Sequence, residues 1–516
     1  MYPFASAVAS ARHWFREDIE APAIEFLGGP ARFKVIVLLA CVLGLDAADK
    51  ATIGAIAVRL QAALNIGNVQ LGLLVTATTA VGALATLPLG ILTDRIRRVR
   101  LLTIAIVVWS IAMAVSGFAT SYLMLLLTRL ALGAVVATAA PAIASLTGDF
   151  FRATERGRIF GYIVTGELLG AAFGFVVSAM IADFLNWRMP FWVLSVIGLV
   201  LAGALHWLLP EPARGGQSRI APGDTEILTA EEASDEEVEA PQDDEGGSED
   251  LVEEEIEEAG FGPRPARVLE NDPKGMSWPR AFGYILSIRT NILIIVATAL
   301  AYFYLTGLRT FGVVFMHARF DLSQTAASAI LVASGLGAIA GVLLIGRAAD
   351  REIEHGNFRA RLWVPAIAFG AAIAFLLPGL LVPILYATAI LFFLGAFFFG
   401  GVIPPMNAAR LDIMHSRLWG RGESVNSALR YAFEAIAPIT FGYISTFFGV
   451  GGNVLAQAAH GQAGGDAGLG TTLALMLVTL LGAGIALLFA LRHYPRDVVT
   501  ANASEERTSA GSRQPH

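Results

Sequence analysis

Eight ionisable side chains lie inside long apolar stretches of this 516-residue chain: Asp46, Asp49, Lys50, Arg129, Glu167, Arg309, Arg430 and Glu434. A charge at the centre of a bilayer costs about 3 kcal/mol, so each of these groups must face water, a partner or a solute. A partly desolvated carboxylate can carry a proton, and a guanidinium can hold a carboxylate or a phosphate in a fork of donors. The residue types therefore indicate ion coupling and solute binding.

The first apolar stretch holds three of these charges. Asp46 and Lys50 are four residues apart, so they share a helix face and can form an ion pair. We expect Asp49, on the edge of that face, to carry the coupling proton or cation, with Asp46 as a weaker candidate. The alternative is an Asp46–Lys50 pair that only fixes the helix. Lys50 is also a candidate for the wall of a substrate cavity.

Glu167 and Glu434 occupy matching places in two other stretches, 267 residues apart. Arg430 lies one helical turn before Glu434 and can neutralise it, which leaves a structural pair and a coupling role both open. Glu167 has no local partner. We expect it to be protonated or to pair with Arg129 or a ligand, so it is a second candidate for the proton carrier.

Two further residues are candidates for the substrate cavity. Arg309 would select an anionic group if it faces the cavity, and the alternative is that it snorkels to the outer interface. Asn407 is nearly the only amide inside the apolar stretches. Sugar sites usually contain several Asn, Gln and Trp side chains, so the sequence favours an amphipathic or hydrophobic solute. Arg430 is assigned to the same cavity.

The elements that must position these groups are membrane spans. Hydrophobic residues make up 55% of the chain and charged residues 15%, and mean hydropathy is +0.63, which requires a lipid environment. A span needs about 20 apolar residues. The sequence predicts an all-α protein with twelve transmembrane helices, near 34–58, 69–93, 101–118, 122–147, 159–183, 189–209, 291–315, 325–347, 362–381, 384–409, 425–448 and 470–491.

A repeated motif divides these spans into six plus six. Gly90-Ile-Leu-Thr-Asp94-Arg95 ends the second span, and Gly346-Arg-Ala-Ala-Asp350-Arg351 ends the eighth, 256 residues later. A second set of repeated residues follows. Pro141, Asp149 and Arg156 correspond to Pro405, Asp412 and Arg421, at offsets of 264, 263 and 265 residues. Duplicated membrane units of this size usually move solutes.

Charge outside the spans sets the domain boundaries and the orientation. Arginines collect after spans two, four, eight and ten, which predicts that both termini and the central loop lie in the cytoplasm. We expect the chain to lie in the plasma membrane. Residues 221–263 contain eighteen Asp or Glu and no Lys or Arg, which is typical of a disordered linker. The predicted parts are an N-terminal cytoplasmic segment (1–31), a six-helix bundle (32–210), an acidic disordered linker (211–289), a second bundle (290–491) and a disordered tail (492–516).

Several classes of protein are excluded by what the sequence lacks. Cys41 is the single cysteine, so no intrachain disulfide, redox centre or zinc site is expected. The sequence has no glycine-rich phosphate loop, paired metal ligands or nucleophile elbow, which argues against an enzyme and against any cofactor. Without an ATP motif, the energy must come from an ion gradient or from the solute. The basic residues are spread along the membrane face, so no nucleic-acid partner is expected.

The motif residues resemble the major facilitator superfamily. Its signature after the second helix is matched by Gly90, Leu92, Asp94, Arg95 and Arg98, its repeat copy by Gly346, Asp350 and Arg351, and its fourth-helix element by Arg129 and Gly133. The resemblance implies the fold of that superfamily, with two pseudo-symmetric six-helix bundles. It also implies that the Asp94 and Asp350 motifs act as gating latches, and that Arg129 takes part in cavity polarity and proton coupling.

The second half is most similar to the spinster-type lipid transporters within that superfamily. The shared residues are Pro405-Met-Asn407-Ala408, Asp412, Arg421 and the run from Arg430 to Pro438. We predict a monomeric secondary transporter that moves a small organic, amphipathic or hydrophobic solute by alternating access, coupled to protons or another cation. The alternatives are a spinster-type lysolipid transporter, a multidrug exporter and a non-transporting scaffold or sensor.

Overall fold

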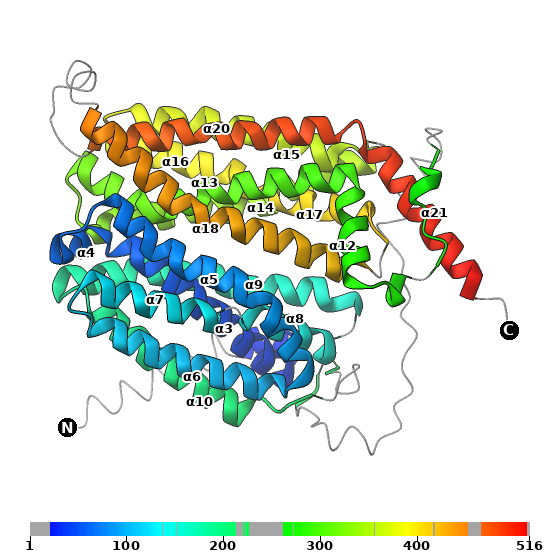
Figure 1. Cartoon of the computed structure of the whole chain (residues 1–516), viewed down its shortest axis with the longest axis horizontal. Coiled ribbons are helices and arrows are strands. Elements are labelled where there is room, and N and C mark those ends of the chain that lie inside the picture. The colour runs from blue at the N-terminus through cyan, green and yellow to red at the C-terminus, as the bar shows by residue number, and fades with distance from the viewer. Residues whose placement is uncertain are drawn as a thin grey trace. The chain divides into compact units, whose positions relative to one another are not determined.

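Helices dominate the fold (Figure 1). The computed structural model describes residues 21–136, 138–151, 153–212, 220–221, 223–225, 262–271, 273–355, 357–415, 418–451 and 466–512. Every one of the twelve predicted spans coincides with a helix or with a pair of consecutive helices. Nine helical segments within these described ranges are long and apolar enough to cross a membrane. The predicted all-α membrane fold is confirmed.

The helix bounds follow the apolar stretches closely. The first half contains α2 (Ala21–Phe26), α3 (Pro30–Ala55), α4 (Ala57–Leu64), α5 (Asn68–Arg95), α6 (Arg98–Gly117), α7 (Tyr122–Val136), α8 (Ala139–Phe150), α9 (Ala153–Phe184) and α10 (Met189–Leu208). The second half contains α12 (Trp278–Ser287), α13 (Arg289–Phe320), α14 (Gln324–Glu354), α15 (Ala360–Leu381), α16 (Leu385–Gly400), α17 (Ile403–Asp412), α18 (Trp419–Gly451), α20 (Asp466–Ala490) and α21 (Tyr494–Ser512).

The fourth and tenth spans are both interrupted. The first of these breaks separates α7 from α8, and the second separates α16 from α17. Pro404 and Pro405 open α17, where the missing N–H groups cost nothing because the first turn of a helix has no acceptors for them. Both interruptions therefore fall at the position of the repeated proline, which supports the duplication.

Large apolar side chains remain exposed along whole helix faces. On α6 the exposed residues Ile104, Val108, Ile111 and Val115 follow one another at helical spacing, and α6 packs beside α10 through its other side (Figure 1). In water such a stripe would be unfavourable, whereas in a membrane it contacts acyl chains. The exposed stripe therefore supports the membrane assignment independently of hydropathy.

The compact units of the structure do not coincide with the two halves of the chain. One unit comprises 1–52, 84–174 and 188–245, and the other comprises 53–83, 175–187 and 246–516. Two segments of the first half therefore pack with helices of the second half, and the predicted boundary between the two bundles stays a prediction. The contacts responsible are close backbone approaches and hydrogen bonds within the second unit.

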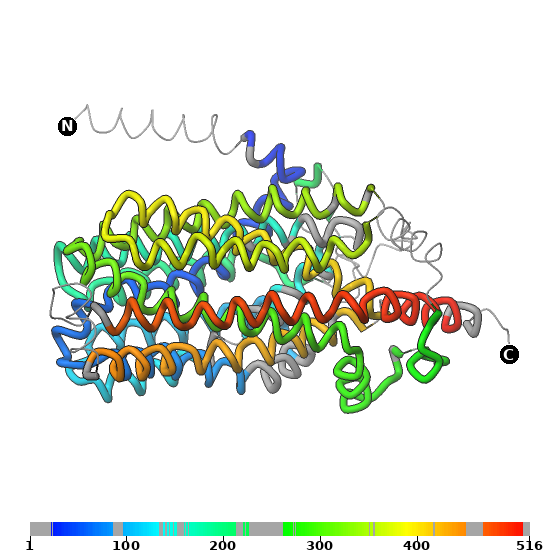
Figure 2. Tube along the Cα trace, turned by 90° about the horizontal axis from the view of Figure 1, so that it is seen from above, coloured from blue at the N-terminus to red at the C-terminus, as the bar shows by residue number. Residues whose placement is uncertain are grey.

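Parts of the predicted linker and tail are helical where the structure describes them. The end of the linker forms α12, an amphipathic helix that buries Ala281 and Ile285, and the tail forms α21, which buries Tyr494 and Val498. Figure 2 shows α21 continuing from α20 at the end of the second unit. These segments carry enough apolar surface to pack although their average composition is polar. Most of the acidic stretch and residues 1–20 lie outside the described residues.

Candidate transport site and gates

Asp49 and Arg129 form a deeply buried ion pair within the first unit. Arg129 Nη1 donates to Asp49 Oδ1 at 2.7 Å, and the two side chains are only 1% and 2% exposed. The guanidinium also lies over the Phe191 ring, 5.0 Å from its centroid. The Arg129 Nε atom is buried and has no hydrogen-bond partner in the described part of the chain. The pair therefore leaves an unused donor beside a group that can bind a proton.

Asp46 and Lys50 flank Asp49 on α3, and Glu167 of α9 lies near Asp46. Lys50 Nζ donates to Asp46 Oδ2 at 2.6 Å, so the predicted pairing one turn apart is observed. Glu167 is half-buried and interacts electrostatically with Asp46. Arg129, one of its expected partners, is taken by Asp49, and Glu167 forms no ion pair with any residue that the structure describes. Whether any of these groups couples transport to protons stays a prediction.

Glycines bring the helices that carry these charges together. Ala40, Gly44 and Ala48 of α3 face Gly166, Gly170 and Gly174 of α9 at four-residue spacing on both helices. A Cβ atom on Gly170 would lie 2.1 Å from the Gly44 carbonyl oxygen, which no side chain can tolerate. Close backbone contact of this kind is how helices associate in a membrane, where the hydrophobic effect gives no help. The contact places Glu167 beside the Asp46 face.

Replacing Gly170 with leucine should separate α3 from α9. The added side chain would be forced against the Gly44 backbone, and overpacking of this kind costs about 1–3 kcal/mol or more. We expect the melting temperature of the purified protein to fall by roughly 5 °C or more, measured by the unfolding of intrinsic tryptophan fluorescence. Gly203→Leu is the matched control, because a Cβ atom at Gly203 of α10 would meet nothing within 4 Å. Equal melting temperatures for both variants would contradict this packing.

A second charged cluster lies in the second unit. Arg430 Nε is 3.3 Å from Glu434 Oε1, so the predicted ion pair on α18 is present. The guanidinium is also 4.5 Å from the Tyr302 ring centroid and 4.8 Å from that of Tyr431. Such stacking on two aromatic rings stabilises a cation away from water. Both halves of the chain therefore hold an arginine–carboxylate pair: a buried one between helices in the first half and a half-buried one within α18 in the second.

Asn407 and Arg309 have different surroundings. The exposed Asn407 accepts a hydrogen bond from Arg410 Nη1 at 3.4 Å through its Oδ1 atom, and Arg410 also pairs with Glu423. Arg309 is exposed on α13 and forms no ion pair with the described residues. Its carbonyl oxygen would lie 2.4 Å from a Cβ atom on Gly54, so the backbones of α3 and α13 meet there. The assignment of both residues to a substrate cavity stays a prediction.

The gating motifs are only partly visible. Gly90, Asp94 and Arg95 lie in the last turns of α5, and Asp350 lies in α14, but their side chains fall outside the described part of the structure. Gly346 and Arg351 also lie in α14, where the Arg351 carbonyl accepts from the His355 amide. The latch role of both motifs therefore stays a prediction.

The last basic residue of the first motif has a defined partner. Arg98 Nη1 forms an ion pair with Asp149 of α8, and Arg98 is almost fully buried. In the second half Arg361 Nη1 forms the corresponding pair with Asp412 of α17. The two pairs span the same 51 residues of chain, and both partners are offset by the 263 residues seen in the repeated residues of the sequence. The duplication therefore extends to an identical side-chain contact.

In each repeat a residue after the sixth span makes a hydrogen bond to one member of this ion pair. Glu211 accepts from the Arg98 amide at 2.7 Å and from the Val99 amide at 2.8 Å, which caps the start of α6. In the second half Tyr494 of α21 donates its hydroxyl to Asp412. Burial, and then the neighbouring Asp412 carboxylate, raise the pKa of Tyr494 well above its usual value, so the phenol keeps the proton that it donates.

Asp183, at the end of α9, is an important residue that sequence reasoning missed. Its Oδ2 atom accepts from the Thr325 amide at 3.0 Å and from Thr325 Oγ1 at 2.8 Å, and its Oδ1 atom accepts from Gln324 Nε2 at 3.2 Å. Arg59 Nη2 lies 3.7 Å from Oδ1. A carboxylate of the first half thus caps the N-terminus of α14 in the second half. We call Asp183, Arg59, Gln324 and Thr325 the α9–α14 seal.

Backbone contacts continue this seal along α5 and α18. A Cβ atom on Gly72 would lie 2.3 Å from the Pro438 carbonyl oxygen, and one on Gly442 would lie 2.5 Å from the Asn68 carbonyl oxygen. Asn68 Nδ2 donates to Ser445 Oγ at 3.0 Å. These approaches explain why residues 53–83 belong to the second unit. The only hint in the sequence was the presence of glycine and small polar residues near the ends of these spans.

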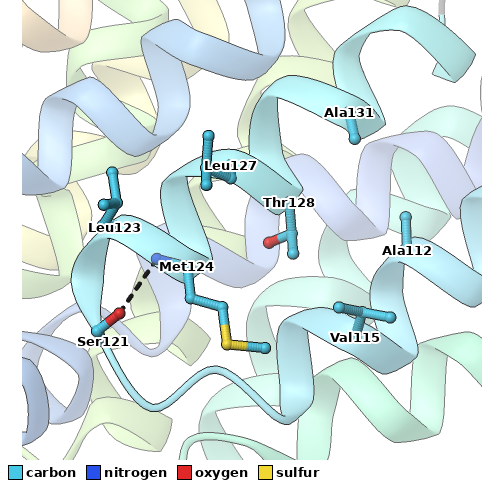
Figure 3. Close-up of a pocket in the computed structure, with 8 residues that line it drawn as sticks. All are labelled: Ala112, Val115, Ser121, Leu123, Met124, Leu127, Thr128 and Ala131. Carbon is cyan, nitrogen blue, oxygen red and sulfur yellow. Dashed lines mark hydrogen bonds between the residues drawn. The ribbon is translucent and has the colours of Figure 1, made fainter.

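An apolar hollow lies between α6 and α7 in the first unit (Figure 3). Its volume is about 510 Å³. Its lining offers two hydroxyl groups, and both are engaged: Ser121 Oγ accepts from the Met124 amide, and Thr128 Oγ1 bonds to Ser116 and Leu125. The remaining lining residues are Ala112, Val115, Leu123, Met124, Leu127 and Ala131. No charged side chain lines this hollow, so it offers no partner for an ionic solute. Its apolar lining resembles the exposed, lipid-facing stripe of α6, and Val115 belongs to both.

Comparison with known proteins agrees with this architecture. The family model described as the Major Facilitator Superfamily matches residues 38–438, so the chain belongs to that superfamily. The predicted family and fold are thereby confirmed. A crystal structure of a bacterial homologue of the human lysosomal transporter Spinster, inward-facing and unoccupied, has a TM-score of 0.70 at 20% identity and covers 91% of this chain and 98% of that one. At this identity the likeness concerns the fold.

Relatives named as transporters match part of the chain. The probable L-galactonate transporter of Escherichia coli K12 is 26% identical over 190 residues, covering 36% of this chain and 42% of the relative. The gallate transporter of Pseudomonas putida is 27% identical over 194 residues, covering 37% and 43%. The chain thus spans less than half the length of these relatives. Their names agree with the prediction of a transporter and not an enzyme.

Proposed function

We propose that this chain is a secondary transporter of the plasma membrane that moves a small amphipathic organic anion by alternating access, coupled to protons. The buried Asp49–Arg129 pair carries the proposal. An ion pair removed from water costs free energy that a hydrophobic pair would not, so a membrane protein gains from it mainly through its ability to switch. The superfamily membership supports the same mechanism.

Arg129 can exchange the Asp49 carboxylate for an anionic group of the solute. A proton on Asp49 removes the charge that holds Arg129, and the guanidinium can then bind the carboxylate of a solute with its released Nη1 and its unused Nε. Release of the solute lets Arg129 attract Asp49 again, which favours loss of the proton. The relatives named for galactonate and gallate are named for carboxylates, which supports an anionic solute.

A spinster-type lysolipid is the second candidate for the solute. The resemblance of the second half and the fold likeness to a Spinster homologue favour it. A lysolipid also carries an anionic phosphate, which a guanidinium binds as readily as a carboxylate. The two candidates therefore differ in the apolar part of the solute and share the same charged site.

Transport by the purified protein in proteoliposomes tests the proposal. Labelled gallate, galactonate and a lysophospholipid would each be offered with and without an imposed pH gradient. We expect one of these classes to accumulate against its gradient at least tenfold more when the pH gradient is present, and an uncoupler should abolish the difference. Transport of every solute at the same rate with and without the gradient would contradict proton coupling.

A further inference from the structure

We infer that a basic cluster beside the start of α13 binds the phosphate group of an anionic phospholipid. The cluster consists of Arg264, Arg267, Arg289 and Arg496. Arg264 and Arg267 precede α12, Arg289 is the first residue of α13, and Arg496 lies in the first turn of α21. Figures 1 and 2 both show α12 and α21 at the same end of the second unit. The inference concerns a surface outside the proposed transport site and does not depend on it.

One carboxylate organises this surface. Asp497 is 3% exposed, and its Oδ1 atom lies 2.7 Å from Arg264 Nη1 and 3.9 Å from Arg267 Nη1. Its Oδ2 atom accepts from the Thr290 amide at 3.1 Å and from Thr290 Oγ1 at 2.7 Å. Asp497 therefore caps the start of α13 and partly neutralises two arginines. Its single negative charge is smaller than the positive charge of the four arginines.

The cluster keeps an excess of positive charge. Arg289 and Arg496 are exposed and form no ion pair with the described residues, and the Arg267 Nη1 atom is buried without a hydrogen-bond partner there. Burial, and then the neighbouring cations Arg267, Arg289 and Arg496, lower the pKa of Arg264 against the opposing effect of Asp497. Cations held this close together attract an anion from outside the cluster.

The pKa of the neighbouring His493 is also affected by the arginines. His493 Nδ1 lies 3.4 Å from Arg264 Nη2. Burial and then Arg264 and Arg289 lower its pKa, so His493 is neutral at physiological pH and adds no charge of its own. Its neutral ring can accept a hydrogen bond from Arg264. The positive field therefore comes from the arginines alone.

Exposed aromatic side chains beside the cluster identify a membrane lipid as the source of the anion. On α12, Trp278 and Phe282 are 52% and 44% exposed, while Ala281 and Ile285 are buried against the protein. An amphipathic helix with exposed aromatic residues next to arginines is typical of a segment at the membrane interface. Tyr284 of α12 is hydrogen-bonded to Ser504 of α21, so the aromatic face and the cluster belong to one surface.

The chemistry of a phosphodiester fits this surface. Its two unesterified oxygens share one negative charge, and a guanidinium binds such a pair of oxygens with two parallel hydrogen bonds. Arg289 and Arg496 present exposed guanidinium groups for this contact. Acyl chains of the same lipid would extend toward the aromatic side chains of α12. A soluble phosphate would use the arginines but leave Trp278 and Phe282 in water.

Native mass spectrometry of lipid adducts on the full-length protein tests this site. The protein would be released from nanodiscs containing phosphatidylglycerol and phosphatidylcholine in equal amounts. We expect adducts of phosphatidylglycerol to predominate, and the double variant Arg267→Gln/Arg289→Gln to reduce them about tenfold or more, since each cation contributes separately to attraction by an anionic lipid. Arg496→Gln changes only an exposed side chain and should reduce them several-fold without disturbing the fold. Arg359→Gln, outside the cluster, is the control and should have no effect.

Three outcomes would overturn the inference. One is an unchanged number of phosphatidylglycerol adducts in both cluster variants. Another is stabilisation of detergent-solubilised protein by inorganic phosphate with no preference for the anionic lipid, which would assign the cluster to a soluble anion. The third is an equal loss of thermal stability for the variants in pure phosphatidylcholine and in pure phosphatidylglycerol, which would mean that the arginines serve an acidic segment of the chain itself.

Discussion

Asp49→Asn should abolish accumulation driven by a pH gradient while leaving exchange of solute across the membrane measurable. In the unmodified protein Arg129 Nη1 lies 2.7 Å from the Asp49 carboxylate. An asparagine at this position can still accept a hydrogen bond from Arg129, but it cannot ionise. Leaving a buried charge without its partner costs about 3–5 kcal/mol, which corresponds to about two to almost four orders of magnitude in an equilibrium. We expect the accumulation ratio in proteoliposomes to fall to that of protein-free vesicles, and counterflow exchange to persist at a reduced rate.

Two further variants separate loss of coupling from loss of structure. Asp321→Asn is a matched control, because Asp321 lies in a left-handed turn after α13, a conformation that asparagine also adopts, and it should transport normally. Removing both charges in Asp49→Asn/Arg129→Gln should recover thermal stability relative to Asp49→Asn, because no buried charge remains unpaired, without recovering coupling. Accumulation that persists in Asp49→Asn and still responds to the pH gradient would refute the role of Asp49.

The spans could be predicted because a bilayer imposes one length and one composition on every helix that crosses it. The same argument explains why two helices were not predicted. Segments outside the membrane are not subject to that constraint, so α12 and α21 were hidden in stretches whose average composition is polar. α12 has a strongly amphipathic pattern over ten residues, but a segment this short next to an acidic stretch gave no reason to expect packing.

Local pairs of charges could be predicted, whereas pairs between helices could not. Asp46–Lys50 and Arg430–Glu434 lie one turn apart on one helix, and helix geometry alone brings them together. Arg129 and Asp49 are 80 residues apart, and Asp183 and Thr325 are 142 residues apart. Such pairs depend on which helices pack together and at what height, and glycine contacts such as Gly44 with Gly170 decide this. The partners were thus visible in the sequence as isolated charges, but their pairing was not.

The α9–α14 seal leads to the second large expected effect, on the balance between conformations. Alternating access requires that contacts between the two halves break and form again, and Asp183 concentrates several such contacts on one carboxylate. Asp183→Ala would remove the acceptor for Gln324 Nε2 and for the Thr325 amide and hydroxyl, while Ser323 would still cap the Ala326 amide. Hydrogen bonds to a charged group contribute about 1.5–3 kcal/mol each, less at a site that is partly exposed. We expect about 2–3 kcal/mol in total, a thirty- to about 150-fold shift toward the state in which the seal is open.

Labelling of a buried thiol measures that shift. Ala57 of α4 is fully buried, and α4 packs on α13 within the second unit. In a background with Cys41→Ser, the thiol introduced by Ala57→Cys should react with a water-soluble maleimide at least tenfold faster when Asp183→Ala is present. Asp183→Asn keeps an acceptor for the Thr325 amide and should give a smaller increase. Arg59→Gln should give the smallest, because Arg59 is 54% exposed and its ion pair is screened by water. Equal labelling rates with and without Asp183→Ala would show that the seal does not hold this end closed.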